Sequence, residues 1–221
     1  METPKTNSVP PLEAFLVIFV TFCLSVIIGA AIILTIGEAP ALVIGELLIL
    51  VVPLVYLMLK RINIKTYIRI DLKPKYILLG IAFGGLLLLL NVVVSGLLTT
   101  VFGTSKAIED SNALLSNLSG STSGIIAVVA SLSLAGICEE FAFRGLLQNS
   151  LNHRYSFLPA TIISAFVFGL FHFDPQLVYI LAAFTSGLAL GYIYHRWNYV
   201  TAATAHSVMN IIVLIFLLLG I

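Results

Sequence analysis

Residues 76–102 read YILLGIAFGGLLLLLNVVVSGLLTTVF, a stretch without a single charged side chain. A helix of about 20 apolar residues crosses the hydrocarbon core of a bilayer, so this stretch is long enough to span a membrane. Helix is the expected form because a chain in lipid must satisfy every backbone N–H and C=O group internally. The stretch therefore predicts a transmembrane helix.

The composition of the whole chain points the same way. Of its 221 residues, 60% are hydrophobic and only 10% are charged, whereas soluble domains are about half apolar and about a quarter charged. The net charge of +1 does not indicate a nucleic-acid partner. Cys23 and Cys138 lie in hydrophobic runs, and two such cysteines indicate neither a disulfide framework nor a metal motif.

Seven segments have the apolar character of membrane spans. They are residues 13–36, 40–59, 76–102, 124–151, 159–172, 176–194 and 199–220. The fifth is short for a full crossing, and the longest could contain a break that raises the number to eight. We therefore predict an all-α polytopic bundle with seven or eight transmembrane helices and an intramembrane polar cavity. We expect one integral domain of the cell membrane over residues 1–221, with a motif-bearing core at about 124–215.

A basic loop at residues 60–75 predicts the orientation of the bundle. It holds six of the eleven Lys and Arg residues, namely Lys60, Arg61, Lys65, Arg69, Lys73 and Lys75. The positive-inside rule places this loop in the cytoplasm, where it would also contact lipid headgroups. We expect the loops with Arg154 and Arg196 on the same side, and the loop at 103–123 and the N-terminus outside.

Two adjacent carboxylates interrupt the apolar pattern of the fourth span, at Glu139 and Glu140. Ionisable groups inside a membrane are costly, and they usually face a cavity and mark a functional site. Glu140 and Arg144 are four residues apart, so they share a helix face and can pair. Glu139 points about 100° away around the helix and cannot pair equally well. One carboxylate is thus neutralised, and the other is left for another role.

A simpler interpretation is a surface salt bridge in which Arg144 extends its charge towards the cytoplasmic interface. That interpretation does not explain Glu139. Two further polar residues, Glu46 and Asn91, lie within other spans. We interpret Glu46 as an acid near the interface and Asn91 as part of an interhelical hydrogen bond.

The later spans add two histidines and an amide. His172 follows Phe168 by four residues, and Asn210 follows His206 by four, so each pair shares a helix face. Taken singly, a histidine among aromatic residues is more often a packed core residue, and a polar pair often joins membrane helices. The set formed with Glu139 is more specific than any of its members.

This set of side chains suits the activation of water. A carboxylate shielded from solvent is a useful general base, and a histidine can share its water. A second histidine and an amide can donate hydrogen bonds to the oxyanion of a tetrahedral intermediate. Glu139, His172 and His206 are also a reasonable Zn²⁺ ligand set, although the helical H-E-x-x-H motif is absent. No serine or cysteine lies in a nucleophile-elbow pattern.

The three motifs resemble those of the CPBP family, which comprises CAAX proteases and bacteriocin-processing enzymes and is also called the Abi family. The family pattern is E-E-x-x-x-R, then F-x-x-x-H, then H-x-x-x-N. Here it reads Glu139-Glu140-x-x-x-Arg144, Phe168-x-x-x-His172 and His206-x-x-x-Asn210. The motifs occur in order on successive hydrophobic segments, between about residues 134 and 210.

The resemblance implies an all-α intramembrane endopeptidase. Carried over by motif, Glu139 and His172 would activate water, and His206 and Asn210 would form the oxyanion hole. Glu140, Arg144 and Phe168 would then be supporting residues. The family is often labelled metalloprotease although this mechanism needs no metal, so we favour no cofactor and leave Zn²⁺ open.

The expected partners are membrane lipids and a peptide or lipidated-protein substrate, such as a CAAX C-terminus or a bacteriocin leader. Two other functions use the same residues: a proton-coupled transporter, and a non-catalytic immunity or scaffold protein with this fold. A transporter usually has paired half-repeats, and the sequence shows none.

The depths of the candidate residues conflict with straight helices. At 1.5 Å per residue, Glu139 would lie ~15–18 Å from the cytoplasmic end of its span, His172 ~20 Å and His206 ~10 Å. A broken or offset helix is therefore needed, and Pro159 and Gly169 are the expected positions for it.

Overall fold

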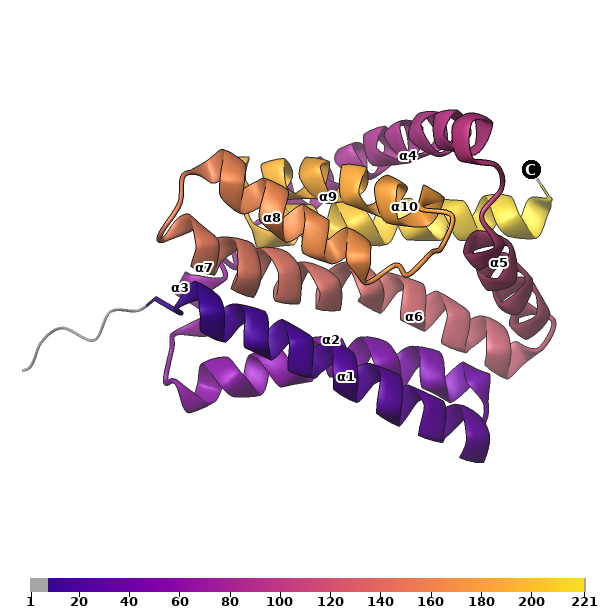
Figure 1. Cartoon of the computed structure of the whole chain (residues 1–221), viewed down its shortest axis with the longest axis horizontal. Helices are drawn as coiled ribbons and strands as arrows, with labels where there is room; N and C mark the ends of the chain where they lie inside the picture. The colour runs from indigo at the N-terminus through magenta and orange to yellow at the C-terminus, as the bar shows by residue number, and fades with distance from the viewer. Residues whose placement is uncertain (1–7, 221) are drawn as a thin grey trace, which may run out of the picture.

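Long apolar helices make up most of the molecule (Figure 1). The computed structural model describes residues 8–220, and this part of the chain contains no strand. The helices are α1 (Pro11–Thr35), α2 (Glu38–Leu59), α3 (Ile64–Tyr67), α4 (Pro74–Phe102), α5 (Lys106–Ser119), α6 (Thr122–Glu140), η1 (Phe141–Gln148), α7 (Asn149–Asn152), α8 (Phe157–Leu170), α9 (Val178–Arg196) and α10 (Tyr199–Leu219). The predicted all-α bundle is confirmed.

Six helical segments are long and apolar enough to cross a membrane: α1, α2, α4, α9, α10 and the continuous segment formed by α6, η1 and α7. Their outer surfaces remain apolar, as at Leu34 and Val101, whose exposed fractions are 86% and 74%. An apolar surface of this extent is stable only in lipid, so the chain is an integral membrane protein. The predicted fifth span corresponds to α8, which has 14 residues and is too short for a full crossing.

The basic loop lies at one end of the bundle, on the left in Figure 1 with α3 and α7, whereas α5 lies at the other end. Arg69 donates hydrogen bonds to the carbonyl groups of Tyr194 and Trp197 at the end of α9. The side chain of Asn149 in α7 donates to the carbonyl of Tyr67. The loops after α7 and α9 therefore share the end of the basic loop, as predicted.

The start of α1 also lies at this end, because Glu13 forms a 2.6 Å ion pair with Lys60. The expectation that the N-terminus lies on the opposite side is therefore wrong. α1 and α2 are antiparallel neighbours, and two crossings return the chain to the side from which it started.

α8 and α9 form an antiparallel hairpin that extends only part of the way through the bundle. Figure 1 shows that α6 and α10 reach further towards the end where α5 lies than the connection between α8 and α9 does. His172 lies in this connection, one residue after the C-cap of α8 at Phe171. The short helix therefore places a histidine within the membrane-spanning part of the molecule.

Candidate active site

Glu139 and Glu140 are the last two residues of α6. The helix continues as η1, eight residues with the i→i+5 bonding of a π-helix, all of them buried. A π-helical segment is rare and often occurs at a functional site. Its wider turns advance less per residue along the axis, so Glu139 lies nearer the end of its span than a straight α-helix would place it.

Contacts with α9 accompany this unusual segment. Arg144 donates a hydrogen bond to the carbonyl of Gly187, and Gln148 donates one to the carbonyl of Gly191. Both glycines lie where a side chain would collide: a Cβ atom at Gly191 would come within 2.7 Å of the Gln148 side chain. Gly187 faces Ala165 and Phe168 of α8, and Gly191 faces Thr161 of α8 and Gln148 of η1, so this G-x-x-x-G surface lets α8 and the side chains of η1 approach α9 closely. The sequence analysis missed Gln148 and both glycines, although the glycine spacing is visible in the sequence.

The predicted pair of Glu140 and Arg144 is present and fully buried. Arg144 Nε lies 3.1 Å from Glu140 Oε2, and both side chains have an exposed fraction of 0%. The guanidinium group also lies 4.4 Å from the centre of the Phe168 ring, a cation–π contact. The simpler interpretation, in which Arg144 reaches the interface, is therefore wrong.

His206 of α10 lies between the two carboxylates. Its Nδ1 is 3.1 Å from Glu140 Oε1, and its Nε2 is 3.6 Å from Glu139 Oε2. Adjacent residues on one helix thus face opposite nitrogens of a single imidazole ring. Glu140 thus forms an ion pair with Arg144 through Oε2 and contacts His206 Nδ1 through Oε1, and the second contact fixes the orientation of the ring.

Glu139 is the more accessible of the two carboxylates. Its side chain is 14% exposed, compared with 0% for Glu140. The difference agrees with the interpretation from the sequence that one carboxylate is neutralised by a partner on its own helix.

His172 joins this cluster through Phe168. Its Nδ1 lies 3.0 Å from the Phe168 carbonyl oxygen, which can only accept, so Nδ1 carries a proton. In the neutral ring Nε2 is then free to accept a proton from water. The Phe168 ring lies edge-to-face against both His172 and His206, with centroid distances of 4.8 Å and 5.9 Å. Phe168 is thus the common neighbour of both histidines and Arg144.

The loop after His172 is fixed by a buried acid that the sequence analysis missed. Asp174 is 1% exposed and accepts hydrogen bonds from the backbone N–H groups of Gln176 and Tyr179. The Tyr179 ring in turn packs edge-to-face on His172, with centroids 4.8 Å apart. Asp174 therefore holds the start of α9 against the histidine.

Asn210 contacts a different group. Its amide nitrogen lies 3.4 Å from the Leu132 carbonyl oxygen of α6, at the long limit of a hydrogen bond. It follows His206 by one helical turn on α10. The described contacts thus join the two glutamates, Arg144 and His206 directly and His172 through Phe168, whereas Asn210 contacts α6.

The expected helix breaks are not where the chain adapts. Pro159 lies in the first turn of α8, where proline is tolerated. Gly169 lies in regular helix, and a Cβ atom there would come within 2.8 Å of the Ile180 carbonyl oxygen of α9. The depth conflict is instead reduced by η1 and by the early end of α8.

Two polar residues outside the motifs have distinct surroundings. Asn91 lies 3.4 Å from Ser186 Oγ of α9, which confirms the predicted interhelical hydrogen bond. Glu46 lies on α2, which packs against α6, and its Oε2 atom has no hydrogen-bond partner among the described residues. Its interpretation as an acid near the interface stays a prediction.

The residues do not fit a metal ion in this arrangement. Within residues 8–220, no three His, Cys, Asp or Glu side chains are placed so that they could hold one. Glu139, His172 and His206 therefore do not form a ready ligand set.

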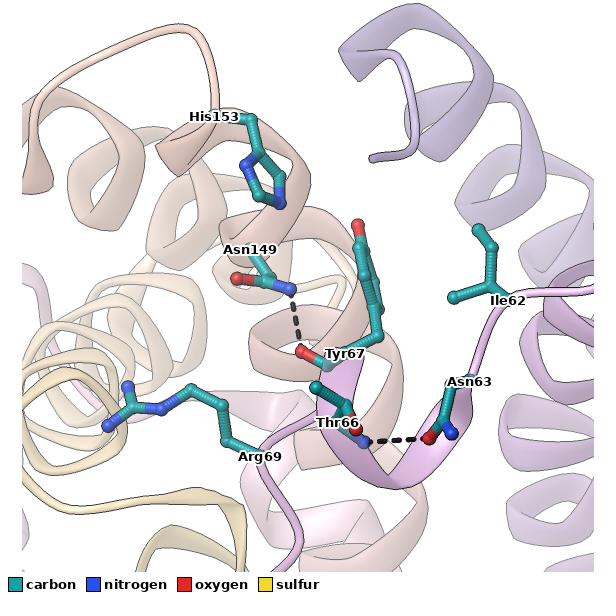
Figure 2. Close-up of a pocket in the computed structure, with 7 residues that line it drawn as sticks. All are labelled: Ile62, Asn63, Thr66, Tyr67, Arg69, Asn149 and His153. Atoms are coloured by element: carbon teal, nitrogen blue, oxygen red, sulfur yellow. Dashed lines mark hydrogen bonds between the residues drawn. The ribbon is translucent and has the colours of Figure 1, made fainter. Parts of the chain in front are cut away.

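A separate cavity of about 230 Å³ lies at the basic end of the bundle (Figure 2). Its lining includes Arg69, Asn149 and His153, but none of the motif residues. The Asn149 side chain donates a hydrogen bond to the Tyr67 carbonyl of α3, and the Asn63 side chain accepts one from the backbone N–H of Thr66, as the dashed lines in Figure 2 show. The Asn149 bond attaches the basic loop to α7, whereas the Asn63 bond caps the start of α3 within the loop.

The comparisons with known proteins agree with this cluster. Residues 121–212 match the family model of Rce1-like proteins, the type II CAAX prenyl endopeptidases. No curated protein and no solved structure matches the chain. The matched residues include all three motifs and nearly coincide with the predicted core at 124–215. The motif-bearing part of the chain, residues 121–212, is therefore similar to the Rce1-like family of type II CAAX prenyl endopeptidases.

Proposed function

We propose that this protein is an intramembrane endopeptidase that cuts a peptide bond near the cytoplasmic leaflet. The observation that carries the proposal is the position of His206 between Glu139 and Glu140, within a buried cluster that also contains His172. Such a cluster costs stability in a membrane protein, which favours a functional role over a structural one. The family match supports peptide-bond hydrolysis as that role.

In the proposed reaction, Glu139 takes a proton from a water molecule while His172 Nε2 helps to orient that water. The resulting hydroxide attacks the carbonyl carbon of the peptide bond, and His206, held by Glu140 at Nδ1, donates from Nε2 to the oxyanion. When the tetrahedral intermediate collapses, the C–N bond breaks and Glu139 returns its proton to the leaving amine nitrogen. Asn210 becomes a second donor when its amide leaves the Leu132 carbonyl, a change that its 3.4 Å bond makes inexpensive.

We propose that the substrate is a lipidated or membrane-proximal peptide that enters from the basic end. His206 follows the start of α10 at Tyr199 by seven residues, so it lies ~10 Å from that end. A peptide carrying a lipid near its C-terminus would keep the lipid in the bilayer while the scissile bond reaches this depth. If the basic loop is cytoplasmic, this is the inner leaflet.

Cleavage by the purified protein in lipid nanodiscs tests the proposal. The substrates are matched peptides that end in a CAAX sequence with and without a prenyl group, together with a bacteriocin-type leader peptide. We expect cleavage of the prenylated peptide, no cleavage by Glu139→Ala or His172→Ala, and cleavage products identified by mass spectrometry. Equal cleavage by wild type and both variants would contradict the assigned roles.

A chelator arm addresses the metal question separately. We expect the cleavage rate to be unchanged by a strong chelator, because the three candidate ligands are not grouped around one point. Loss of activity that Zn²⁺ restores would replace the proposed water activation with a metal mechanism. If no peptide is cut, proton flux in liposomes tests the transporter alternative.

A further inference from the structure

A polar groove of about 530 Å³ lies at the basic end of the bundle, next to the cavity shown in Figure 2. The groove and that cavity share Thr66 and Arg69 as lining residues. On its other side the groove is lined by Tyr76 at the start of α4 and by Trp197 and Asn198 between α9 and α10. Its volume is within the ~300–1,000 Å³ that is typical of ligand sites, and no residue of the three motifs lines it.

The groove lies at the level where two membrane spans end. Tyr76 is the third residue of α4, and Trp197 is the C-cap of α9; both helices are long and apolar enough to cross a membrane. Tyrosine and tryptophan are enriched at the boundary between lipid and water, where the headgroups lie. Ile77 and Leu78, directly after Tyr76, are 40% and 66% exposed. A molecule in this groove can therefore place a polar part beside the basic loop and an apolar part along α4.

Positive charge dominates the lining of the groove. Lys65 and Arg69 both line it, and Lys65 has no ion-pair partner among the described residues. Asp71 is the only acid among the described residues of the lining, and its carboxylate is 2.9 Å from Lys73 Nζ. The charge of this acid is thus balanced by its own partner. The groove is left with a positive charge that a bound anion can neutralise.

Part of this charge is held in a fixed position. Arg69 donates hydrogen bonds to three backbone carbonyl groups at the end of α9. Its backbone φ of 62° is in the left-handed region, which is uncommon for a residue other than glycine and occurs most often at functional sites. A further cation, Arg196, lies with Cζ 5.7 Å from the centre of the Trp197 ring. The groove therefore presents a preformed cationic wall beside an aromatic residue.

We propose that this groove binds the headgroup of an anionic phospholipid, whose phosphate contacts Lys65 and Arg69 and whose acyl chains lie along Ile77 and Leu78. Basic pockets between transmembrane helices are typical sites for anionic headgroups. The apolar surface beside the groove favours a lipid over a soluble phosphate, which would use the cations alone. The groove is separate from the catalytic cluster, so this inference does not depend on the proposed endopeptidase function.

Native mass spectrometry of the purified full chain tests the site with equal amounts of phosphatidylglycerol and phosphatidylcholine that have the same acyl chains. We expect wild type to retain phosphatidylglycerol in preference to phosphatidylcholine. Lys65→Ala should lower that retention about threefold to tenfold, because each cation near a headgroup contributes moderately to binding. Lys65→Arg keeps the charge and should retain the lipid as wild type does. Arg154→Ala is the matched control, because it removes an exposed cation from the same end of the bundle but outside the groove.

Thermal unfolding separates lipid binding from folding. Without added lipid, Lys65→Ala should unfold at the wild-type temperature. Added phosphatidylglycerol should stabilise wild type and Arg154→Ala equally and Lys65→Ala less, because a ligand stabilises only the state that binds it. Equal stabilisation by inorganic phosphate would indicate a site for soluble anions and would overturn the proposal. Equal retention of the two lipids by wild type, or equal losses in Lys65→Ala and Arg154→Ala, would also overturn it.

Discussion

The Nδ1 atom of His206 lies 3.1 Å from Oε1 of Glu140. This contact links two motifs that are 66 residues apart in the sequence, and it makes Glu140 the common partner of Arg144 and His206. Glu140 therefore has two effects that can be separated: it balances a buried charge, and it orients an imidazole ring.

Loss of Arg144 separates these two effects. Arg144→Leu leaves a buried carboxylate without its cation, so we expect a loss of about 3–5 kcal/mol in the free energy of unfolding. The double variant Glu140→Gln/Arg144→Leu removes both charges and should recover most of that loss. The double variant should nevertheless cut the substrate more slowly than wild type, because His206 no longer has a carboxylate partner at Nδ1. Thermal unfolding and cleavage rates measured on the same samples check both parts, and a double variant less stable than Arg144→Leu would count against the pairing.

Gly191→Ala tests the close packing of η1 on α9. A methyl group there meets Gln148 and Thr161 atoms at 2.7 Å, so we expect a loss of about 1–3 kcal/mol and reduced activity. Gly96→Ala in α4 is the control, because a Cβ atom at Gly96 has no neighbour within 4 Å. That variant should match or slightly exceed wild-type stability, since alanine favours helix. Equal unfolding temperatures for the two variants would show that the G-x-x-x-G contact is unimportant.

Arg69 joins the basic loop to the end of α9, where it donates to three backbone carbonyl groups. We expect Arg69→Ala to lower stability by about 1–2 kcal/mol, since hydrogen bonds from charged donors are moderately strong. Arg69→Lys should keep only part of this stability, because an ammonium group cannot reproduce the planar arrangement of N–H donors in guanidinium. Lys65→Ala, an exposed change in the same loop, should have no effect on the unfolding temperature. A similar decrease in unfolding temperature for Arg69→Ala and Lys65→Ala would show that the loss of positive charge in the loop, and not the loss of the backbone hydrogen bonds, lowers stability.

Asp174→Ala tests the anchoring of the loop that carries His172. The change leaves two backbone N–H groups without their acceptor, so the start of α9 should move away from the histidine. We expect kcat to fall about tenfold to a hundredfold, because small displacements of catalytic groups are costly. Asp71→Ala, an acid in the basic loop, is the control and should keep wild-type kcat. Unaltered kcat in Asp174→Ala would show that the loop is held by other contacts.

Much of the fold follows from local sequence patterns. Uncharged runs such as 76–102 define spans because lipid leaves the backbone no alternative to helix. The pairing of Glu140 with Arg144 follows from four-residue spacing alone, and the structure contains it. The burial of that pair could not be predicted from the sequence, because residue spacing does not show whether a helix face points to the protein interior or to the surface.

The rest depends on contacts between distant segments. The sequence of residues 141–148 does not indicate a π-helix. The hydrogen bonds that accompany this conformation run from the side chains of Arg144 and Gln148 to carbonyl groups of α9, which is distant in the sequence. Counting residues along straight helices therefore placed Glu139 and His206 at different depths.

The most direct test of the account is the single-turnover cleavage rate of Glu139→Gln, since amide and carboxyl have nearly the same size but an amide is not a base. The account predicts a rate about 10²–10⁴ times slower than wild type, with an unfolding temperature equal to or above that of wild type. A Glu139→Gln protein that is folded and cuts within about threefold of the wild-type rate would contradict it.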